Sequence, residues 1–485
     1  MNDTRIIKNY LYNLIYQILT ILLPIITIPY ISRVLKAEGI GIYALTNTCA
    51  QYFIFLGMLG LAVYSSREIA YVREDKEKLN KVFWELNLIR FISMGISTLF
   101  YIIIFGFIVK SEYKYIYMIQ ILILISSMVD ISWLFVGMEK FGDIVLRNTI
   151  VKLLGVILIF LLVKNSSQVW LYAFILGITQ LLGQLIMWID LPKEIKFKLP
   201  KERNLIRHFK LSIKLFIPQI AINVYTMLDK IMLGIFTDEV QVGMYDNSQR
   251  VIKIVVVIVT TLSTVMVPRM ANLYNNNNKS EFLKNVYKSF SFVSFIAFPM
   301  SFGLIAISKS FIPWFYGQGF NGIEPMFYIG SFLIITLGWT SILGNQILIS
   351  IKRENQFTIA VTIGAIVNLI FNFLLIGQYK GVGTTISSLL AEYIGMFLML
   401  FFLRDIINIK KLFTGIYKYA VSSLVMFFIV YIIGVYMPAT IITTFFQIFI
   451  GVFIYMSIMF IVKDPNLMYA LKFIINLIRK FKKSY

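Results

Sequence analysis

The sequence has very few of the residues on which enzymes and secreted domains commonly depend. It holds one cysteine, Cys49, and one histidine, His208, among 485 residues. A single cysteine excludes an intrachain disulfide, and a single histidine cannot form a catalytic dyad on its own. No Walker loop, metal-ligand cluster or nucleophile with a spaced histidine is visible. We therefore expect neither a cofactor nor direct use of ATP, and we predict that the protein is not an enzyme.

Charged residues are also scarce, at 14% of the chain against 59% hydrophobic residues, which excludes a pair of ordinary soluble domains. Apolar runs of about 20 residues can each cross roughly 30 Å of hydrocarbon as a helix. They predict an all-α polytopic membrane protein with about fourteen transmembrane helices. The runs lie near 9–34, 40–66, 82–109, 115–137, 144–164, 168–190, 211–236, 240–268, 286–308, 325–350, 357–377, 382–403, 412–436 and 438–462.

Acidic residues are fewer than basic ones: the chain has 24 Asp and Glu against 45 Lys and Arg, which gives a net charge of +21. Such an excess can indicate nucleic acid, but here the cations concentrate in every second connection between spans, as in 67–81 and 193–210. The positive-inside rule explains this bias, so we expect no nucleic acid partner. It predicts a multi-pass membrane protein with both termini in the cytoplasm. Frequent Ile, Lys, Asn and Tyr, including the run 275–278, hint at a bacterium and so at its cytoplasmic membrane. His208 lies in one of these connections and is expected to face solvent or headgroups.

An internal repeat is present. The segments GIGIY (39–43) and VGMY (242–245) each precede an apolar run, and 24 residues separate Tyr43 from Arg67 and Tyr245 from Arg269. The seventh span follows the first by six crossings, so both copies enter the membrane in the same direction and the repeats are parallel. Internal duplication of this kind is typical of transporters.

The repeat and the charge pattern predict five regions. The N-lobe covers 1–190, a basic cytoplasmic linker 191–210, the C-lobe 211–404, and two additional spans 405–462. The tail 463–485 has apolar residues at helical spacing among lysines and is predicted to lie as an amphipathic helix on the inner membrane surface, in contact with anionic lipid.

Five stretches carry a resemblance to a known family. PYISRVLKAEGIGIYALT with GLAVYSSREIAYVRED, LDKIMLGIFTDEVQVGMYDNSQRVIKI with VPRMANLY, and NLIFNFLLIGQYKGVGTTISSLLAE are similar to bacterial oligosaccharide flippases, the Wzx-like polysaccharide transporters. These belong to the multidrug/oligosaccharidyl-lipid/polysaccharide exporter superfamily. The resemblance implies two parallel six-helix bundles around a central cavity, alternating access, and undecaprenyl-diphosphate-linked sugars as substrate.

Ionisable side chains inside spans are costly, about 2.5–3.5 kcal/mol at a helix centre, and so indicate a wet cavity or a partner. A diphosphate needs converging cations with hydrogen-bonding neighbours. Lipid II flippases place arginines on their first and eighth helices, which resembles Arg33 and Arg250, although Val34 stands here where those proteins have Asp. The predicted substrate cavity comprises Arg33, Asn47, Gln51, Asp229, Lys230, Asp246, Gln249, Arg250 and Lys253. The alternative is that Asp229, Lys230, Asp246 and Arg250 merely neutralise one another.

Four further charges have two interpretations each. Asp130 and Glu392 are isolated acids within spans four and twelve, and they either bind a coupling proton or sodium ion or are structural. Arg67 and Arg269 recur in register at the ends of spans two and eight. They form a cytoplasmic gate, or they are positive-inside anchors.

The leading hypothesis is a flippase that carries polyprenyl-diphosphate-linked oligosaccharide between leaflets, driven by an ion or by the membrane potential. Partners would be the glycan substrate, membrane lipid, and glycosyltransferases or a polymerase of the same pathway. A cation-coupled multidrug antiporter of the same fold is the alternative, but it should have an acid-rich cavity. A membrane polymerase or ligase is disfavoured because the longest outer connection, 309–324, is short. Capsule, teichoic acid and other wall polymers all remain open as the glycan.

Overall fold

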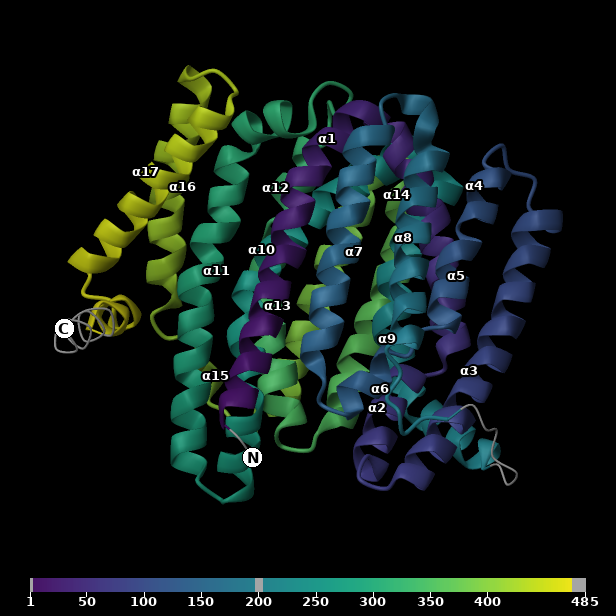
Figure 1. The fold of residues 1–485 in the computed structure, drawn as a ribbon. Helices are drawn as coiled ribbons and strands as arrows, with labels where there is room; N and C mark the ends of the chain where they lie inside the picture. The colour runs from purple at the N-terminus through teal and green to yellow at the C-terminus, as the bar shows by residue number, and fades with distance from the viewer. Residues whose placement is uncertain (1–2, 197–203, 473–485) are drawn as a thin grey trace, which may run out of the picture. The chain divides into compact units, whose positions relative to one another are not determined.

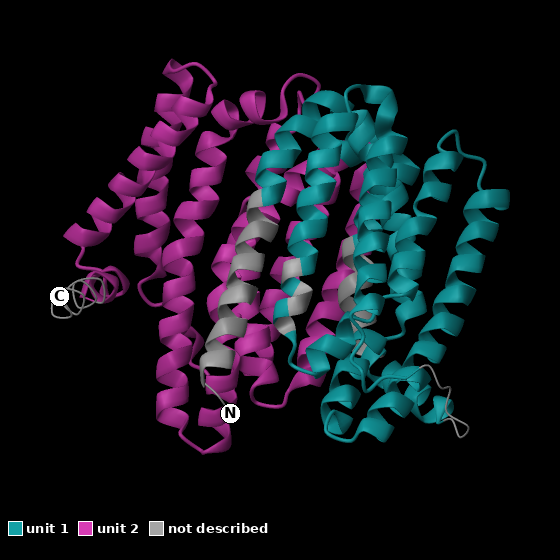
Figure 2. Ribbon diagram, viewed as in Figure 1, with its two compact units in different colours: residues 1–243 teal, residues 244–485 magenta. Residues whose placement is uncertain are grey.

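The computed structural model describes residues 3–196 and 204–472. Within those residues the chain is helical, joined by short turns, and contains no strand. The predicted all-α class is therefore confirmed. The chain divides into two compact units, residues 1–243 and 244–485 (Figure 2).

Unit 1 contains the helices of the first half of the chain (Figure 1). They are α1 (Asp3–Met58), α2 (Leu61–Val72), α3 (Lys76–Ile103), the π-helix η1 (Ile104–Ile108), α4 (Lys114–Ile119), α5 (Ile121–Met128), α6 (Ser132–Gly137), α7 (Phe141–Leu162), the 3₁₀ turn η2 (Ser166–Gln168), α8 (Val169–Ile189) and α9 (Leu205–Phe236).

Unit 2 contains most of α10 and all that follows it; the first residues of α10, up to Gly243, belong to unit 1. Its helices are α10 (Glu239–Asn275), α11 (Lys279–Tyr316), α12 (Glu324–Gly330), α13 (Phe332–Thr340), the π-helix η3 (Ser341–Ile349), α14 (Glu354–Leu403), α15 (Ile409–Phe413), α16 (Ile416–Tyr436) and α17 (Ile441–Ile461).

Within the described residues, nine helices are long and apolar enough to cross a membrane, or ten if the bent pair 23–58 and 61–72 forms one span. The protein is thus a multi-pass membrane protein. Two of the long helices contain a break: α1 is kinked at Lys36, with φ 58°, and α14 at Lys380, with φ 51°. α1 and α14 each consist of two helices joined at the kink, so the number of long helices does not give the number of spans. The fourteen spans therefore stay a prediction.

Polar caps fix several helix starts. The Asp75 carboxylate accepts hydrogen bonds from the N–H groups of Glu77 (3.2 Å) and Lys78 (3.1 Å) at the start of α3. Asn278 caps α11 through the N–H of Glu281, and Thr440 caps α17 through that of Thr443. These side chains satisfy N–H groups that have no partner inside the helix.

Two glycines of the repeat lie against each other in unit 1. A Cβ atom built on Gly41 would lie 1.7 Å from the carbonyl oxygen of Glu239, and one built on Gly243 would lie 1.9 Å from that of Ala37. Gly41 and Gly243 occupy the same place in the two copies of the repeat. Backbone meets backbone at this crossing, which only glycine permits.

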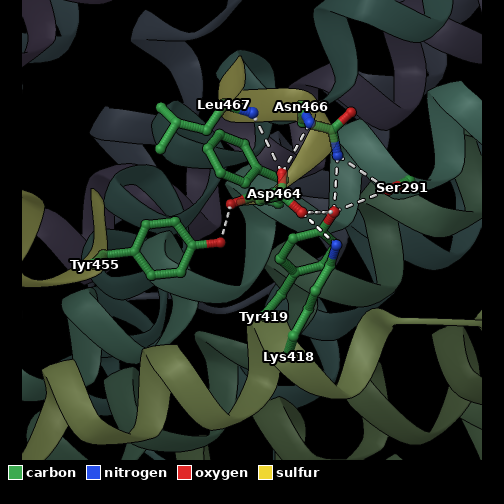
Figure 3. Close-up of polar contacts among 8 residues, drawn as sticks. Ser291, Lys418, Tyr419, Tyr455, Asp464, Asn466 and Leu467 are labelled. Carbon is green, nitrogen blue, oxygen red and sulfur yellow. Dashed lines mark hydrogen bonds and ion pairs between the residues drawn. The ribbon is translucent and has the colours of Figure 1, made fainter. Parts of the chain in front are cut away.

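In unit 2, α11 packs along α16 and α17, and a buried polar cluster closes that junction (Figure 3). Asp464 has no exposed surface and forms an ion pair with Lys418. Its carboxylate also accepts hydrogen bonds from the Tyr419 hydroxyl (3.0 Å) and the backbone N–H of Asn466 (2.9 Å). The Asn466 amide in turn donates to Ser291 of α11 at 3.0 Å.

The cluster also starts the predicted tail helix. Residues 465–472 are helical, and Asp464 lies at the N-terminus of that helix, where it accepts from the N–H groups of Asn466 and Leu467. The rest of the predicted amphipathic segment, 473–485, lies outside the described residues, as do 197–203 of the predicted linker.

Candidate functional site

The first turns of α10 in unit 2 hold one group of predicted site residues. Arg250 follows Asp246 by one turn, and its Nε lies 2.7 Å from Asp246 Oδ2. The Asp246 side chain is only 4% exposed, whereas that of Arg250 is 35% exposed. Tyr316 of α11 is fully buried nearby and donates its hydroxyl to the Asn247 carbonyl at 3.0 Å. The acid is therefore buried beneath a cation that still has accessible surface.

Gln249 and Lys253 occupy two other positions on the same helix. Gln249 is 7% exposed, and its Nε2 is buried without a hydrogen-bond partner among the described residues. A Cβ built on Gly330 of α12 would lie 3.8 Å from that nitrogen. Lys253 is exposed. The structure thus pairs Asp246 with Arg250, in agreement with the alternative that these charges neutralise one another. Part of the surface of Arg250 and Lys253 nevertheless stays accessible.

The matching positions of unit 1 are polar but uncharged. Asn47 donates to Gln120 Oε1 at 3.4 Å, and Gln120, itself buried, donates to Thr46 Oγ1 at 3.2 Å. Gln51 is half-buried one turn later in α1. Gln120 stands at the end of α4 and was missed by sequence reasoning, because an amide within an apolar run gives no signal of what it will contact.

Three predicted cavity residues lie elsewhere in unit 1. Arg33 is exposed on α1, where its Nη1 donates to the Pro29 carbonyl at 3.1 Å. Asp229 on α9 is buried, at 4% exposure, and its neighbour Lys230 is half-buried. A role for these three in substrate binding stays a prediction.

Asp130 is not the isolated acid that the sequence indicated. Nη1 of Arg90, a buried residue of α3, lies 3.5 Å from Asp130 Oδ2 and also donates to the Asp130 backbone carbonyl. The Arg90 guanidinium lies over the Trp133 ring, 5.6 Å from its centroid. Asp130 is thus half-buried beside a fully buried cation, whereas Glu392 lies half-buried in the second part of α14. Ion coupling at either acid stays a prediction.

The two arginines in register differ in their surroundings. Arg269 donates to Glu281 at 3.3 Å, with both side chains exposed, and Arg67 is exposed in α2. An exposed pair of this kind contributes little to stability. A shared gate or anchor role stays a prediction.

His208 was expected to face solvent or headgroups, and this was wrong. It is 4% exposed. Its Nδ1 lies 2.7 Å from the Tyr64 hydroxyl and its Nε2 lies 3.1 Å from Glu85 Oε2. Glu85 also accepts the backbone N–H of Asn204 at 2.8 Å. The cluster fastens the start of α9 to α2 and α3, so the imidazole serves as a buried connector between three helices.

Within the described residues no three His, Cys, Asp or Glu side chains gather as a metal site would require. A buried amide pair does occur in α14, where Asn372 donates to Asn368 Oδ1 at 3.1 Å and both residues are at most 1% exposed. Taken together, the arrangement consists of hydrogen-bonding side chains and surface-accessible cations on long apolar helices. Such groups form hydrogen bonds and ion pairs with anions and hydroxyls.

Comparison with known proteins assigns the chain to a family. A profile of the family described as "Polysaccharide biosynthesis protein" matches residues 6–274. The chain belongs to this family. The predicted membership in the Wzx-like polysaccharide transporters is thereby confirmed.

Relatives of this family match along most of the chain. A "Putative O-antigen transporter" of Escherichia coli (strain K12) is 23% identical over 415 residues, covering 83% of this chain and 98% of that protein. A protein of the same description from Shigella dysenteriae is 25% identical and covers 78% of this chain and 95% of its own length. The "Capsular polysaccharide biosynthesis protein CapF" of Staphylococcus aureus is 21% identical over 82% of this chain.

Solved structures agree on the fold. The lipid II flippase MurJ in an inward closed conformation superimposes with a TM-score of 0.77 at 18% identity, covering 94% of this chain and 99% of that one. An inward-facing multidrug resistance MATE transporter gives 0.60 at 11% identity, covering 81% and 99%. At these identities the likeness concerns the fold alone, and it confirms the polytopic fold of the exporter superfamily.

Proposed function

We propose that this protein flips polyprenyl-diphosphate-linked oligosaccharide from the inner to the outer leaflet of the bacterial cytoplasmic membrane, by alternating access. The observation that carries the proposal is membership of the polysaccharide biosynthesis family, together with relatives of nearly full length whose descriptions are O-antigen transporters. The product would supply a cell-surface polysaccharide such as a capsule, or another wall polymer. Both termini would lie in the cytoplasm, as the positive-inside rule predicts.

The chemistry of α10 supports this substrate class. A diphosphate is bound best by cations that present several N–H donors, and Arg250 and Lys253 supply such groups three residues apart. Burial of Asp246 beneath Arg250 fixes the guanidinium in position. A cavity for cationic drugs would instead need unpaired acids, so the antiporter alternative has the weaker support.

The remaining predictions complete the proposal. We retain the N-lobe, linker, C-lobe, two additional spans and tail as its functional regions. A proton or sodium ion, or the membrane potential, would drive the cycle. Glycosyltransferases or a polymerase of the same pathway would supply and consume the lipid-linked glycan.

The test is flipping by the full chain reconstituted in vesicles that contain an undecaprenyl-diphosphate-linked oligosaccharide. Exposure of the glycan is followed by its accessibility to a glycosidase outside. We expect the double variant Arg250→Ala with Lys253→Ala to lose most of the flipping, because the diphosphate loses its cations. Lys279→Ala, an exposed lysine at the start of α11, is the matched control and should flip normally.

A second pair of variants separates substrate binding from mere neutralisation of Asp246. If Arg250 only neutralises Asp246, the combination Asp246→Asn with Arg250→Gln removes both charges and should flip better than Arg250→Gln alone. If Arg250 binds the diphosphate, the combination stays inactive although it folds. Normal flipping by a well-expressed Arg250→Ala, Lys253→Ala variant would contradict the assignment of the cations, and absence of flipping by the wild type would contradict the function.

A further inference from the structure

Unit 1 contains a second polar site that the cationic residues do not account for. A cavity of about 480 Å³ lies between α1, α7 and α8. Asn148 and Lys152 line it from α7, and Gln180 and Gln184 line it from α8. Tyr43 of α1 completes the wall and meets Tyr172 of α8 edge to face, with ring centroids 4.8 Å apart.

The four amide and lysine side chains of α7 and α8 all line this cavity. On α7, Asn148 and Lys152 are one turn apart, and the exposed residues Ile157 and Leu161 lie on the opposite face. On α8, Gln180 and Gln184 repeat this spacing. Polar groups that line a cavity between membrane helices mark a ligand pathway, because the same groups in contact with lipid would be costly.

One of these groups lacks a partner. Gln184 Oε1 is buried and has no hydrogen-bond partner among the described residues. Burying an unsatisfied amide oxygen costs free energy, which a ligand hydroxyl or N–H that reaches it would recover. An amide both donates and accepts, and so it complements sugar hydroxyls and acetamido groups, which do the same.

The charge of the cavity argues against a diphosphate. Lys152 is the one cation among the described residues that line it, and the rest of the lining consists of amides, hydroxyls and aliphatic side chains. A diphosphate calls for several converging cations, whereas one ammonium suits a single carboxylate. Amides, tyrosines and one cation set in an otherwise apolar wall suit a largely uncharged ligand that carries hydroxyls and one acidic group.

We infer that this cavity is a glycan subsite, which selects an acidic sugar of the lipid-linked substrate. Gln184 and Asn148 bind its hydroxyl or acetamido groups, and Lys152 binds its carboxylate. The inference rests on the proposed function, since it concerns the sugar part of the same substrate. It makes α7 and α8, rather than α10, the determinants of which glycan is carried.

The test is binding of three probe lipids to the full chain in nanodiscs: undecaprenyl diphosphate, its N-acetylglucosamine derivative, and a disaccharide derivative that ends in glucuronic acid. Gln184→Leu should weaken both sugar-bearing lipids by about tenfold and leave undecaprenyl diphosphate unchanged. Lys152→Gln should weaken only the glucuronic acid probe, and Lys152→Arg should retain it. Lys164→Gln, a lysine just beyond the C-terminal end of α7 and outside the cavity, is the matched control.

Folding is checked by thermal unfolding, and Gln184→Glu provides a nearly isosteric second variant. It should weaken the glucuronic acid probe more than the neutral one, through repulsion between carboxylates. Equal weakening of undecaprenyl diphosphate by Lys152→Gln would assign the cavity to the diphosphate and overturn the inference, as would unchanged binding of all three probes. A wild-type protein that binds none of the probes would instead contradict the proposed function itself.

Discussion

At the scale of single residues, Asp464 is a carboxylate held entirely inside unit 2 (Figure 3). It is compensated by the Lys418 ammonium, the Tyr419 hydroxyl and two backbone N–H groups. Because these partners come from α16 and from the start of the tail helix, the acid joins the two. Removing one partner of such a buried pair destabilises the fold, because the other charge is left buried without compensation.

Asp464→Ala should therefore be strongly destabilising, by about 3–5 kcal/mol, because Lys418 is left as a partly buried cation without its acid. The measurement is the free energy of unfolding in detergent, followed by tryptophan fluorescence. Lys463→Gln changes the exposed neighbouring residue and should have little effect. If Asp464→Ala unfolds like the wild type, the cluster does not hold α16 and the tail together.

A second carboxylate, Asp405, lies outside the spans and forms a solvent-exposed ion pair, whereas that of Asp464 is buried. Arg353 donates to Asp405 Oδ1 at 2.9 Å and to Oδ2 at 2.5 Å, and its guanidinium lowers the pKa of that carboxyl. Asp405 is about half exposed, so the pair stabilises the fold by less than about 1 kcal/mol. It connects the turn before α14 to the residues after it.

The sign of the pH dependence follows from the lowered pKa of Asp405. The stabilisation is complete above the unfolded pKa, near 4, and is lost as the pH falls through the lower pKa of the folded state. We expect Asp405→Asn to be slightly less stable than the wild type at pH 7, with the difference vanishing in acid. Unfolding by denaturant at a series of pH values measures this, and a difference that grows in acid would contradict it.

The sequence could not predict which side chains contact one another across helices. Hydropathy places Arg90 within a span, but its partner Asp130 lies 40 residues away, in the break between α5 and α6. His208 was assigned to solvent because its neighbours in the chain are charged, yet Tyr64 and Glu85 enclose it from α2 and α3. Contacts between helices depend on rotation about each axis, which apolar runs of this kind do not specify.

At the scale of elements, the repeat has a structural meaning that its sequence alone did not give. Gly41 and Gly243 mark equivalent points of the two copies, and there the backbone of α1 contacts that of the first residues of α10, 239–243, within unit 1. Each would place a Cβ less than 2 Å from a carbonyl oxygen of the other helix. Close crossings at small residues are a general means of packing membrane helices.

Gly41→Ala should accordingly force α1 away from the first residues of α10, lower the melting temperature and reduce flipping. The matched control is Gly95→Ala in α3, where an added Cβ meets no atom within 4 Å. That substitution should be neutral or stabilising by up to about 1 kcal/mol, because alanine favours a helix over glycine. Equal melting temperatures for the two variants would show that the crossing is looser than the structure has it.

Helix breaks divide into those that the sequence predicts and those that it does not. Lys36 falls between the predicted runs 9–34 and 40–66, and Lys380 between 357–377 and 382–403. Both kinks thus lie where hydropathy ends one span and begins the next. The π-helical segments η1 and η3 lie inside single apolar runs and were not foreseen, because their backbone register depends on packing.

At the scale of the whole molecule, the family was predicted correctly because its motifs are local and the repeat keeps them in register. The glycan could not be predicted in the same way. Its proposed contacts, such as Lys152 and Gln184, stand on separate helices within apolar runs and match no motif. Only the fold brings them to one cavity.

The charge of the substrate and that of the protein together predict how transport is driven. A membrane potential that is negative inside favours the outward movement of negative charge by about 2.3 kcal/mol per charge for each 100 mV. With Arg250 and Lys253 as the proposed substrate site, the emptied site keeps two cations, and the same field favours their return toward the cytoplasm. Both halves of the cycle therefore gain from the potential, whereas an electroneutral exchange would not.

We accordingly expect flipping in reconstituted vesicles to accelerate when a potassium gradient with valinomycin makes the interior of the vesicle, at the cytoplasmic face of the protein, negative. Reversing the gradient should slow it, and Arg250→Gln with Lys253→Gln should weaken the dependence on potential along with the rate. An imposed proton or sodium gradient at zero potential is the control that separates field from ion coupling. Full activity with neither potential nor ion gradient would contradict a driven mechanism and would leave consumption of the glycan outside as the source of direction.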